Sequence, residues 1–397
     1  MNYSAARLPA IAAIAPADWN RLALRGPEPA FGPAGNPFVS HAFLSALETS
    51  GSAVPAAGWT PHHLVLSDES GEAAAVAPCY LKSHSRGEYV FDQGWAEAFE
   101  RAGGRYYPKL LCAVPFTPAT GPRLIGRDAE ASGALAQALA AEAGGLGVSS
   151  AHVTFMSETE ARLAAACGYL LRTDQQFHFD NPGYRDFADF LDALSSRKRK
   201  NIRKERETAL RDGVEIAILT GRDLTEAVWD RFFEFYMDTG SRKWGRPYLT
   251  REFYSRIGAA MADRIFLVMA RRGGRYIAGA INFLGDGVLY GRHWGAVEDR
   301  PCLHFEVCYY RAIEFAIANR IARVEAGAQG EHKLARGYGP VTTWSAHFIV
   351  HPGLRAAVAD YLLRERRHVE RTGEALAEHT PFRKDGGISA SSNPKAG

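Results

Sequence analysis

The sequence predicts an α/β fold, in which helices pack on a mixed sheet, and predicts that this fold occurs twice. The 397 residues exceed the roughly 100 to 200 residues that one domain usually holds. Strand and helix patterns alternate in both halves, which is typical of helices covering a sheet. The order of these patterns in the first half returns in the second. We therefore expect an N-terminal domain over residues 1–181, a C-terminal domain over residues 182–380 and a disordered tail over residues 381–397.

The first half begins with a helix signal, because Ser40 can cap a helix that ends at Gly51. Three strand patterns separated by short turns then predict an antiparallel meander over residues 62–68, 72–84 and 88–92. The elements expected after it are a helix over 96–104, a buried strand over 109–116, an Ala/Leu-rich helix over 131–146, and a strand, helix and strand over 151–156, 159–169 and 169–179.

The second half repeats this order. The expected elements are helices over 223–240 and 250–263, a meander over 264–270, 275–284 and 288–295, a helix over 303–320, a strand over 323–329 and a loop over 330–340. Apolar residues recur every four positions from Phe305 to Ile317, so one stripe of that helix should face the sheet. Because Gly71 and Gly274 mark equivalent turns of the two meanders, we interpret the chain as a duplication of one fold.

The composition excludes several classes of protein. No run of about 18 apolar residues is present, and the N-terminus lacks a basic segment followed by an apolar one. The five cysteines are scattered and include no CxxC pair, so no disulfide framework is predicted. We expect a cytoplasmic protein without stable membrane insertion. No feature of the sequence predicts the oligomeric state.

The strongest charge feature is the segment from Ser195 to Glu207, which holds seven basic and two acidic residues in a chain of net charge +3. It predicts a helix with cations around most of its circumference. Such a helix is often only solvated, but the cations also suit a polyanion such as tRNA, a nucleotide-linked substrate or an anionic membrane surface. The candidate polyanion-binding residues are Arg197, Lys198, Arg199, Lys200, Arg203 and Lys204.

Several segments resemble the FemAB-like N-acyltransferases, namely residues 89–110, 113–124, 289–296, 303–316 and 325–341. The order of the predicted elements also resembles the GNAT acyltransferase fold, present here as two tandem domains. The likeness extends over roughly residues 36–361. The resemblance implies transfer of an acyl or aminoacyl group to an amine, by direct attack within a ternary complex. The acceptor it implies is a small-molecule or peptide amine, in the manner of a peptidoglycan precursor.

The resemblance leaves two donors, aminoacyl-tRNA and acyl-CoA, and we expect no tightly bound cofactor. GNAT acetyltransferases hold the pyrophosphate of coenzyme A on a glycine-rich loop at a helix N-terminus, and residues 295–306 contain no such loop. Its absence favours tRNA, whereas the absence of the helical hairpin arm of Fem ligases counts against tRNA. The alternative from another class is a non-catalytic double-GNAT module that binds peptide or RNA.

Polar residues gather where strands of the second half end, which is where open α/β sheets bind ligands. Aminoacyl transfer depends mainly on positioning and on stabilising the oxyanion, because the donor is already activated. We expect Glu306, His293 or His332 to accept a proton. We expect cations to hold a carbonyl or phosphate, and the residues for substrate binding are Arg292, Trp294, His304, Glu325, Gln329, Glu331, Lys333 and Arg336.

These residues also have ordinary structural interpretations. Glu306 could form a buried ion pair with Arg292 or Arg336, and the polar loop could simply be solvated. The sequence His304-Phe305-Glu306 resembles a zinc-deaminase HxE motif but lacks a later PCxxC, so no metal is expected. In the first half, charged and aromatic side chains predict an acceptor groove, or a core position for the aromatic ones; they are Asp92, Trp95, Tyr107 and Lys109.

Overall fold

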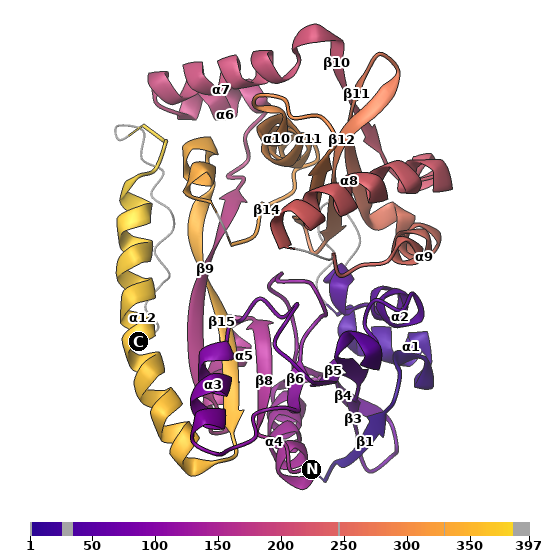
Figure 1. The fold of residues 1–397 in the computed structure, drawn as a ribbon, viewed down its shortest axis with the longest axis vertical. Helices are drawn as coiled ribbons and strands as arrows, with labels where there is room; N and C mark the ends of the chain where they lie inside the picture. Colours follow the sequence, from indigo (N-terminus) through magenta and orange to yellow (C-terminus); the bar gives the residue numbers. More distant parts are fainter. Residues whose placement is uncertain (1, 26–34, 245–246, 329, 384–397) are drawn as a thin grey trace.

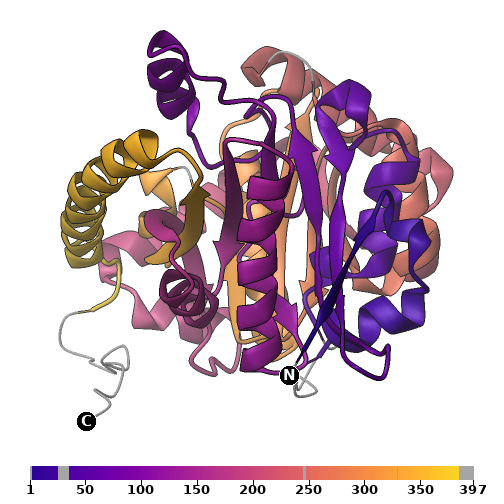
Figure 2. The same ribbon diagram turned by 90° about the horizontal axis from the view of Figure 1, so that it is seen from below.

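The computed structural model describes residues 2–25, 35–244, 247–328 and 330–383. Within them, helices cover both faces of a large mixed sheet that extends through both halves of the chain (Figure 1, Figure 2). The predicted α/β class is therefore confirmed. Among the described helices, none is both long enough and apolar enough to span a membrane.

The first half contains β1 (Ser4–Leu8), α1 (Pro16–Ala23), α2 (His41–Thr49), β2 (Trp59–Pro61), β3 (His63–Ser67), β4 (Ala73–Ala77), β5 (Cys79–Lys82), α3 (Gln93–Arg101), β6 (Lys109–Cys112), β7 (Ile125–Gly126), α4 (Ala129–Gly145), β8 (Ser150–Met156), α5 (Glu158–Ala166) and β9 (Leu170–Asp180). The Ser40 hydroxyl accepts a hydrogen bond from Phe43 N and caps α2 as predicted.

The predicted meander of the first half is partly wrong. The expected strand over 72–84 is divided at Pro78 into β4 and β5, which belong to different sheets, since proline has no N–H for a ladder. The expected strand over 88–92 is absent. Tyr89 there has a positive φ of 59°. The side chains of Glu88 and Asp92 hold this segment instead, through ion pairs with the buried Lys109.

The second half contains α6 (Phe187–Ala193), α7 (Ser196–Ala209), β10 (Val214–Leu219), α8 (Glu226–Trp244), α9 (Arg251–Met261), β11 (Ile265–Arg272), β12 (Arg275–Gly285), β13 (Val288–Ala296), α10 (Leu303–Phe305), the π-helical turn η7 (Glu306–Tyr310), α11 (Arg311–Ala318), β14 (Arg323–Glu325), the 3-10 helix η8 (Glu331–Arg336), β15 (Gly339–Ile349) and α12 (Pro352–Glu378). The helix expected over 303–320 is thus interrupted by η7, and β14 is shorter than predicted. The sequence patterns did not predict β15 or α12.

The last strands of the two halves are exchanged. The long sheet has the order β10-β11-β12-β13-β14-β9-β15-β8-β6-β5-β2, so β15 from the second half lies between β8 and β9 of the first. In turn, β9 pairs through His178 with Glu325 of β14. Figure 1 shows β9 and β15 as long neighbouring strands beside α12. The division into residues 1–181 and 182–380 stays a prediction, because one sheet runs through both halves.

Residues 381–383, expected to begin a disordered tail, have a defined place in the structure. Pro381 O accepts a hydrogen bond from Ser195 N at 3.0 Å, and Phe382 forms a β-bridge with Leu194. Residues 384–397 lie outside the described residues. The C-terminal end of the described chain therefore packs at the start of α7.

One hydrophobic cluster contains buried residues of both halves of the chain. Phe38 of the first half forms edge-to-face contacts with Phe283 and Tyr290 of the second, at centroid distances of 5.2 and 5.1 Å. Phe43 contacts Phe253 in the same way at 5.6 Å. Such pairs contribute about 0.5–1.5 kcal/mol each beyond the area that they bury. The position of the second half relative to the first is therefore fixed by packing.

We predict that Phe38→Ala lowers the free energy of unfolding by about 3–5 kcal/mol, since it leaves a cavity among buried aromatic rings. Urea unfolding followed by tryptophan fluorescence should show one transition at a lower midpoint. A first transition at the wild-type midpoint, followed by a second, would contradict a core shared by both halves.

Candidate active site

The second half has an opening in its sheet where β13 and β14 separate. These strands pair in parallel only from Val288 to Tyr290, opposite Arg323 to Glu325. Beyond that point β13 continues along β12, with a bulge at Ile281 and Asn282. In the described part of the chain, no strand pairs with the other edge of residues 291–295. Backbone N–H and C=O groups on this edge can therefore bind an amide-bearing ligand.

A cavity of about 100 Å³ lies at this opening. It brings together Arg292, His293, Trp294 and His304, four residues that the sequence analysis selected. The other lining residues are Ala280, Ile281, Asn282, Gly291, Cys308, Tyr309 and Ala326. Two of these, Cys308 and Tyr309, were missed by sequence reasoning, because a π-helical turn has no clear sequence signal.

The turn η7 separates its side chains between the cavity and α7. Cys308 and Tyr309 line the cavity, whereas Glu306 and Tyr310 bind α7. π-Helical turns within helices are frequent at functional sites. The Tyr309 hydroxyl lies 3.0 Å from His332 Nε2, so His332 orients Tyr309 from behind. Burial raises the pKa of Tyr309, which keeps the hydroxyl protonated as a hydrogen-bond donor.

His293 of β13 lines the cavity. Its ring packs edge-on against Tyr236 at 5.1 Å, and its Nδ1 has no hydrogen-bond partner among the described residues. Burial, followed by the charge of Arg292, lowers the pKa of His293 to about 3. The ring is therefore neutral near pH 7.

Glu306, predicted as a proton acceptor, lies in a structural ion-pair cluster. Its carboxylate is fully buried and accepts two hydrogen bonds from Arg206 of α7, both at 3.0 Å. Arg311 approaches the same carboxylate at 2.8 Å. The expected alternative partners, Arg292 and Arg336, are not the ones found. With both oxygens bound and facing α7, Glu306 is poorly placed to take a proton from a substrate in the cavity.

The remaining described candidates of the second half are buried, and two of them bind groups of the protein itself. Both oxygens of Glu205 in α7 accept hydrogen bonds from Arg336 at 2.8 Å, so Arg336 is not free for phosphate. Lys333 Nζ donates to Ala326 O at 2.6 Å, and burial lowers its pKa to about 8. Burial raises the pKa of Glu325 to about 7. Gln329 and the side chain of Glu331 lie outside the described residues.

The acceptor groove expected in the first half is instead a buried charge cluster. Lys109 Nζ is fully buried and donates to Glu88 at 2.7 Å and to Asp92 at 2.5 Å. Trp95 packs against His347 at 4.9 Å. Only Tyr107 is partly exposed, and its hydroxyl lies 2.7 Å from Ser85 Oγ. The charges bind one another because an isolated buried charge would be too costly, so no substrate groove forms.

The equivalent opening of the first half, between β6 and β8, is filled by residues 113–123. Gly121 N donates to Phe155 O of β8 at 3.0 Å. Pro118 O accepts a hydrogen bond from Gln176 of β9 at 2.5 Å. Phe116 O accepts one from Arg292 at 2.8 Å. We call residues 113–123 the plug loop. It closes the first opening and touches the cavity of the second half.

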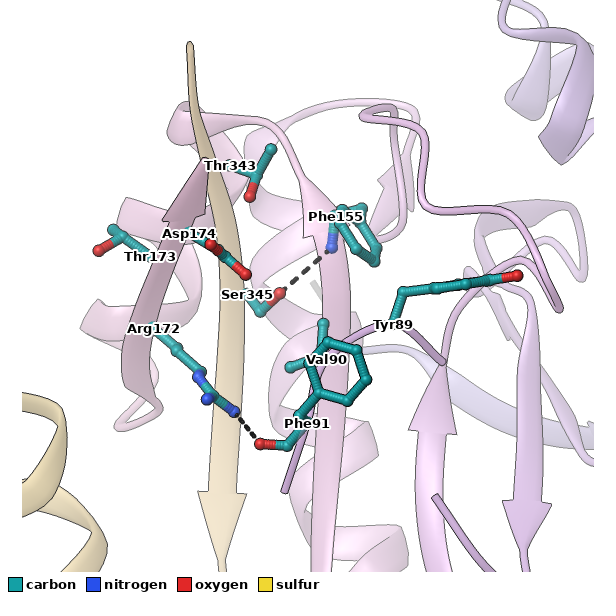
Figure 3. Close-up of a pocket in the computed structure, with 9 residues that line it drawn as sticks. All are labelled: Tyr89, Val90, Phe91, Phe155, Arg172, Thr173, Asp174, Thr343 and Ser345. Atoms are coloured by element: carbon teal, nitrogen blue, oxygen red, sulfur yellow. Dashed lines mark hydrogen bonds between the residues drawn. The ribbon is translucent and has the colours of Figure 1, made fainter. Parts of the chain in front are cut away.

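A small hollow of about 20 Å³ remains in the first half (Figure 3). It lies between Tyr89, Val90 and Phe91 on one side and strands β8, β9 and β15 on the other. Arg172 at its edge already donates to Phe91 O at 2.7 Å and pairs with Glu365. A hollow of this size holds about one water molecule. The cavity of the second half is therefore the better candidate active site.

The basic segment forms α7, but it has one packed side and one cationic side. Ile202, Glu205 and Arg206 face η7 and its neighbours. Of the six candidate cations, Arg199 pairs with Asp192 at 2.8 Å. The other five have no ion pair with a described carboxylate, and they are Arg197, Lys198, Lys200, Arg203 and Lys204. The packed residues thus form one stripe of α7, and cations lie around most of the remaining circumference.

Comparisons with known proteins agree with this fold. A family model of FemAB-like proteins, described as peptidoglycan biosynthesis/recognition, matches residues 10–384. The solved structure of FemX has a TM-score of 0.54 at 12% identity, covering 87% of this chain and 98% of FemX. The C-terminal domain of a putative lysylphosphatidylglycerol synthetase from Agrobacterium fabrum has a TM-score of 0.52 at 12% identity, covering 88% and 95%. No curated protein matches the sequence.

We predict that Glu306→Ala lowers the free energy of unfolding by about 3 kcal/mol, since it leaves Arg206 and Arg311 without their buried carboxylate. Denaturant unfolding measures this loss. Glu207→Ala, at an exposed pair with Arg211, is the matched control and should change stability by less than about 0.5 kcal/mol. A Glu306→Gln variant of wild-type stability but without activity would restore the catalytic hypothesis.

Proposed function

The chain belongs to the FemAB-like family of acyltransferases, and we propose that its reaction takes place in the cavity beside β13. The observation that supports this location is the contrast between the two openings of the sheet. The first is filled by the plug loop, whereas the second is lined by Arg292, His293 and Tyr309. Of the two openings in the described sheet, the second is therefore the one where groups able to bind substrates and accept a proton come together.

The proposed reaction is a direct acyl transfer to an amine. The amine nitrogen attacks the acyl carbonyl carbon, a C–N bond forms, and the C–O or C–S bond to the donor breaks. An α-amine has a pKa of about 7.7–8.0, so much of it is already neutral near pH 7. Neutral His293 accepts the proton that the attacking nitrogen loses. Tyr309, held by His332, donates a hydrogen bond to the departing oxygen or sulfur.

Aminoacyl-tRNA is the donor that we propose. Five cations of α7 have no ion pair with a described carboxylate, so they can bind a phosphate backbone. The packed side of the same helix binds η7, whose Tyr309 lines the cavity. An RNA end bound along α7 would therefore be separated from the cavity only by α7 and the turn η7. Against acyl-CoA stands the helix after β13, which begins at Leu303 with Cys302 as its N-cap and follows no glycine-rich turn of the kind that holds a pyrophosphate.

The proposed acceptor is a peptide amine, as in a peptidoglycan precursor. Two features support it, the family description and the unpaired edge of β13, whose backbone can pair with an extended peptide. A non-catalytic module that binds peptide or RNA is the competing function. Transfer of mass to the amine separates the two.

The deciding experiment incubates the purified chain with charged tRNA or with acyl-CoA, adds peptide amines, and measures the mass of the amine. We predict an aminoacyl mass increment that ribonuclease abolishes. Tyr309→Phe should reduce kcat by about 100-fold, since it removes the donor to the leaving group. Tyr361→Phe, at an exposed tyrosine of α12, should leave kcat unchanged. Full activity of Tyr309→Phe would exclude this role, and no product from either donor would favour the binding module.

Charge reversal on α7 tests the tRNA surface. We predict that Lys198→Glu, Lys200→Glu and Arg203→Glu together abolish tRNA binding at physiological salt, because RNA affinity depends on phosphate contacts. Filter binding at several salt concentrations should also show a smaller salt dependence. Arg364→Glu, Arg367→Glu and Arg371→Glu on exposed positions of α12 make the same charge change as a control. Equal loss in both triple variants would mean that only net charge matters.

A further inference from the structure

Arg292 has no carboxylate partner among the described residues, unlike three other arginines of the second half. Arg206, Arg311 and Arg336 each bind a glutamate. Arg292 donates a single hydrogen bond that is described, to the backbone oxygen of Phe116 in the plug loop at 2.8 Å. Arg292 is also one of the residues that line the cavity. The guanidinium is therefore oriented from one side and open to a ligand on the other.

Burial makes it costly to keep the Arg292 guanidinium charged without a counter-charge. Burial lowers the pKa of the guanidinium, and the neighbouring Tyr89 and Glu325 oppose that shift only in part. Burial also raises the pKa of Glu325 to about 7, so this carboxyl carries only part of a negative charge near neutral pH. Removing one ion from water costs several kcal/mol unless a counter-charge is present. Within the described ranges, no salt bridge to Arg292 supplies that counter-charge.

Resting on the function proposed above, we propose that Arg292 binds an anionic group of the acceptor, a carboxylate or a phosphate, while the acceptor amine lies toward Tyr309 and His293. A guanidinium binds both anions through two parallel hydrogen bonds. The acceptor class is thus an amine that carries its own anion, such as an amino acid, a peptide with a free carboxylate or a phosphorylated amine. An uncharged amine would leave Arg292 unpaired.

The adjacent His293 links this binding to the proton transfer. The positive charge of Arg292 is the second cause of the lowered pKa of His293, after burial. An anion on Arg292 cancels that charge and moves the pKa of His293 upward, toward the pH at which a base is effective. An acceptor that carries an anion would in this way raise the basicity of the histidine that accepts its proton.

Binding measured without turnover tests the proposal. The full chain is titrated calorimetrically with glycylglycine, glycylglycinamide and phosphoethanolamine, which carry an amine with a carboxylate, without an anion and with a phosphate. We expect binding of glycylglycine or phosphoethanolamine at least tenfold tighter than of the amide, and the stronger of the two identifies the anion. Arg292→Met should remove this preference, and Arg292→Lys should weaken it severalfold. Arg275→Met, at an exposed arginine of β12, is the control.

Thermal unfolding and turnover then separate the possible failures. Without ligand, Arg292→Met should unfold at or above the wild-type temperature, because an unpaired cation is removed. A fall of several degrees, or equal binding of all three probes to the wild type and to Arg292→Met, would overturn the proposal. The triple reversal on α7 should keep the preference, since those cations are remote from the cavity. Anion-selective binding without transfer refutes the proposed reaction only, whereas equal transfer to charged and uncharged amines refutes only the role of Arg292.

Discussion

The insertion of β15 between β8 and β9 is the constraint on which the rest of the structure depends. This strand belongs to the second half of the chain but completes the sheet of the first, with its residues 339–347 paired to residues 170–178. In return, β9 extends to β14 and supports the strand at the edge of the cavity. Separating the halves would break ladders on both sides of two strands. The strand β14 at the edge of the cavity is therefore held in place by β9 of the first half.

The sheet that runs through both halves has two similar openings, and only one of them is filled by protein. Each lies beside a parallel strand pair, β6 with β8 and β13 with β14. In the first, the plug loop satisfies the free backbone groups, for example through Gly121 N and Phe155 O. In the second, Phe116 of the same loop orients Arg292 instead. The opening of the first half is thus closed, whereas the opening of the second half can bind a ligand.

Local signals predicted local structure well, as the cap at Ser40 and the meander from Ile265 to Ala296 show. They failed where a distant partner decides. Residues 88–92 have a strand pattern, yet Lys109 draws Glu88 and Asp92 inward. For the site, the sequence did predict four residues that line the cavity, because polar residues gather where strands of the second half were expected to end. That Glu306 would bind α7 could not be predicted, because its partner Arg206 is 100 residues away and belongs to a run that looked uniformly solvated.

The two sides of α7 connect the binding of a donor to the geometry of the cavity. Glu205 binds Arg336 and Tyr310, while Arg206 binds Glu306, so three side-chain pairs hold this helix against η7 and η8. Both of these elements also hold the pair formed by Tyr309 and His332. A polyanion that shifts α7 must therefore strain the same ion pairs that place the Tyr309 hydroxyl. The acidic residues inside the basic segment are thus as important as its cations, because they turn a charged surface into a support for the site.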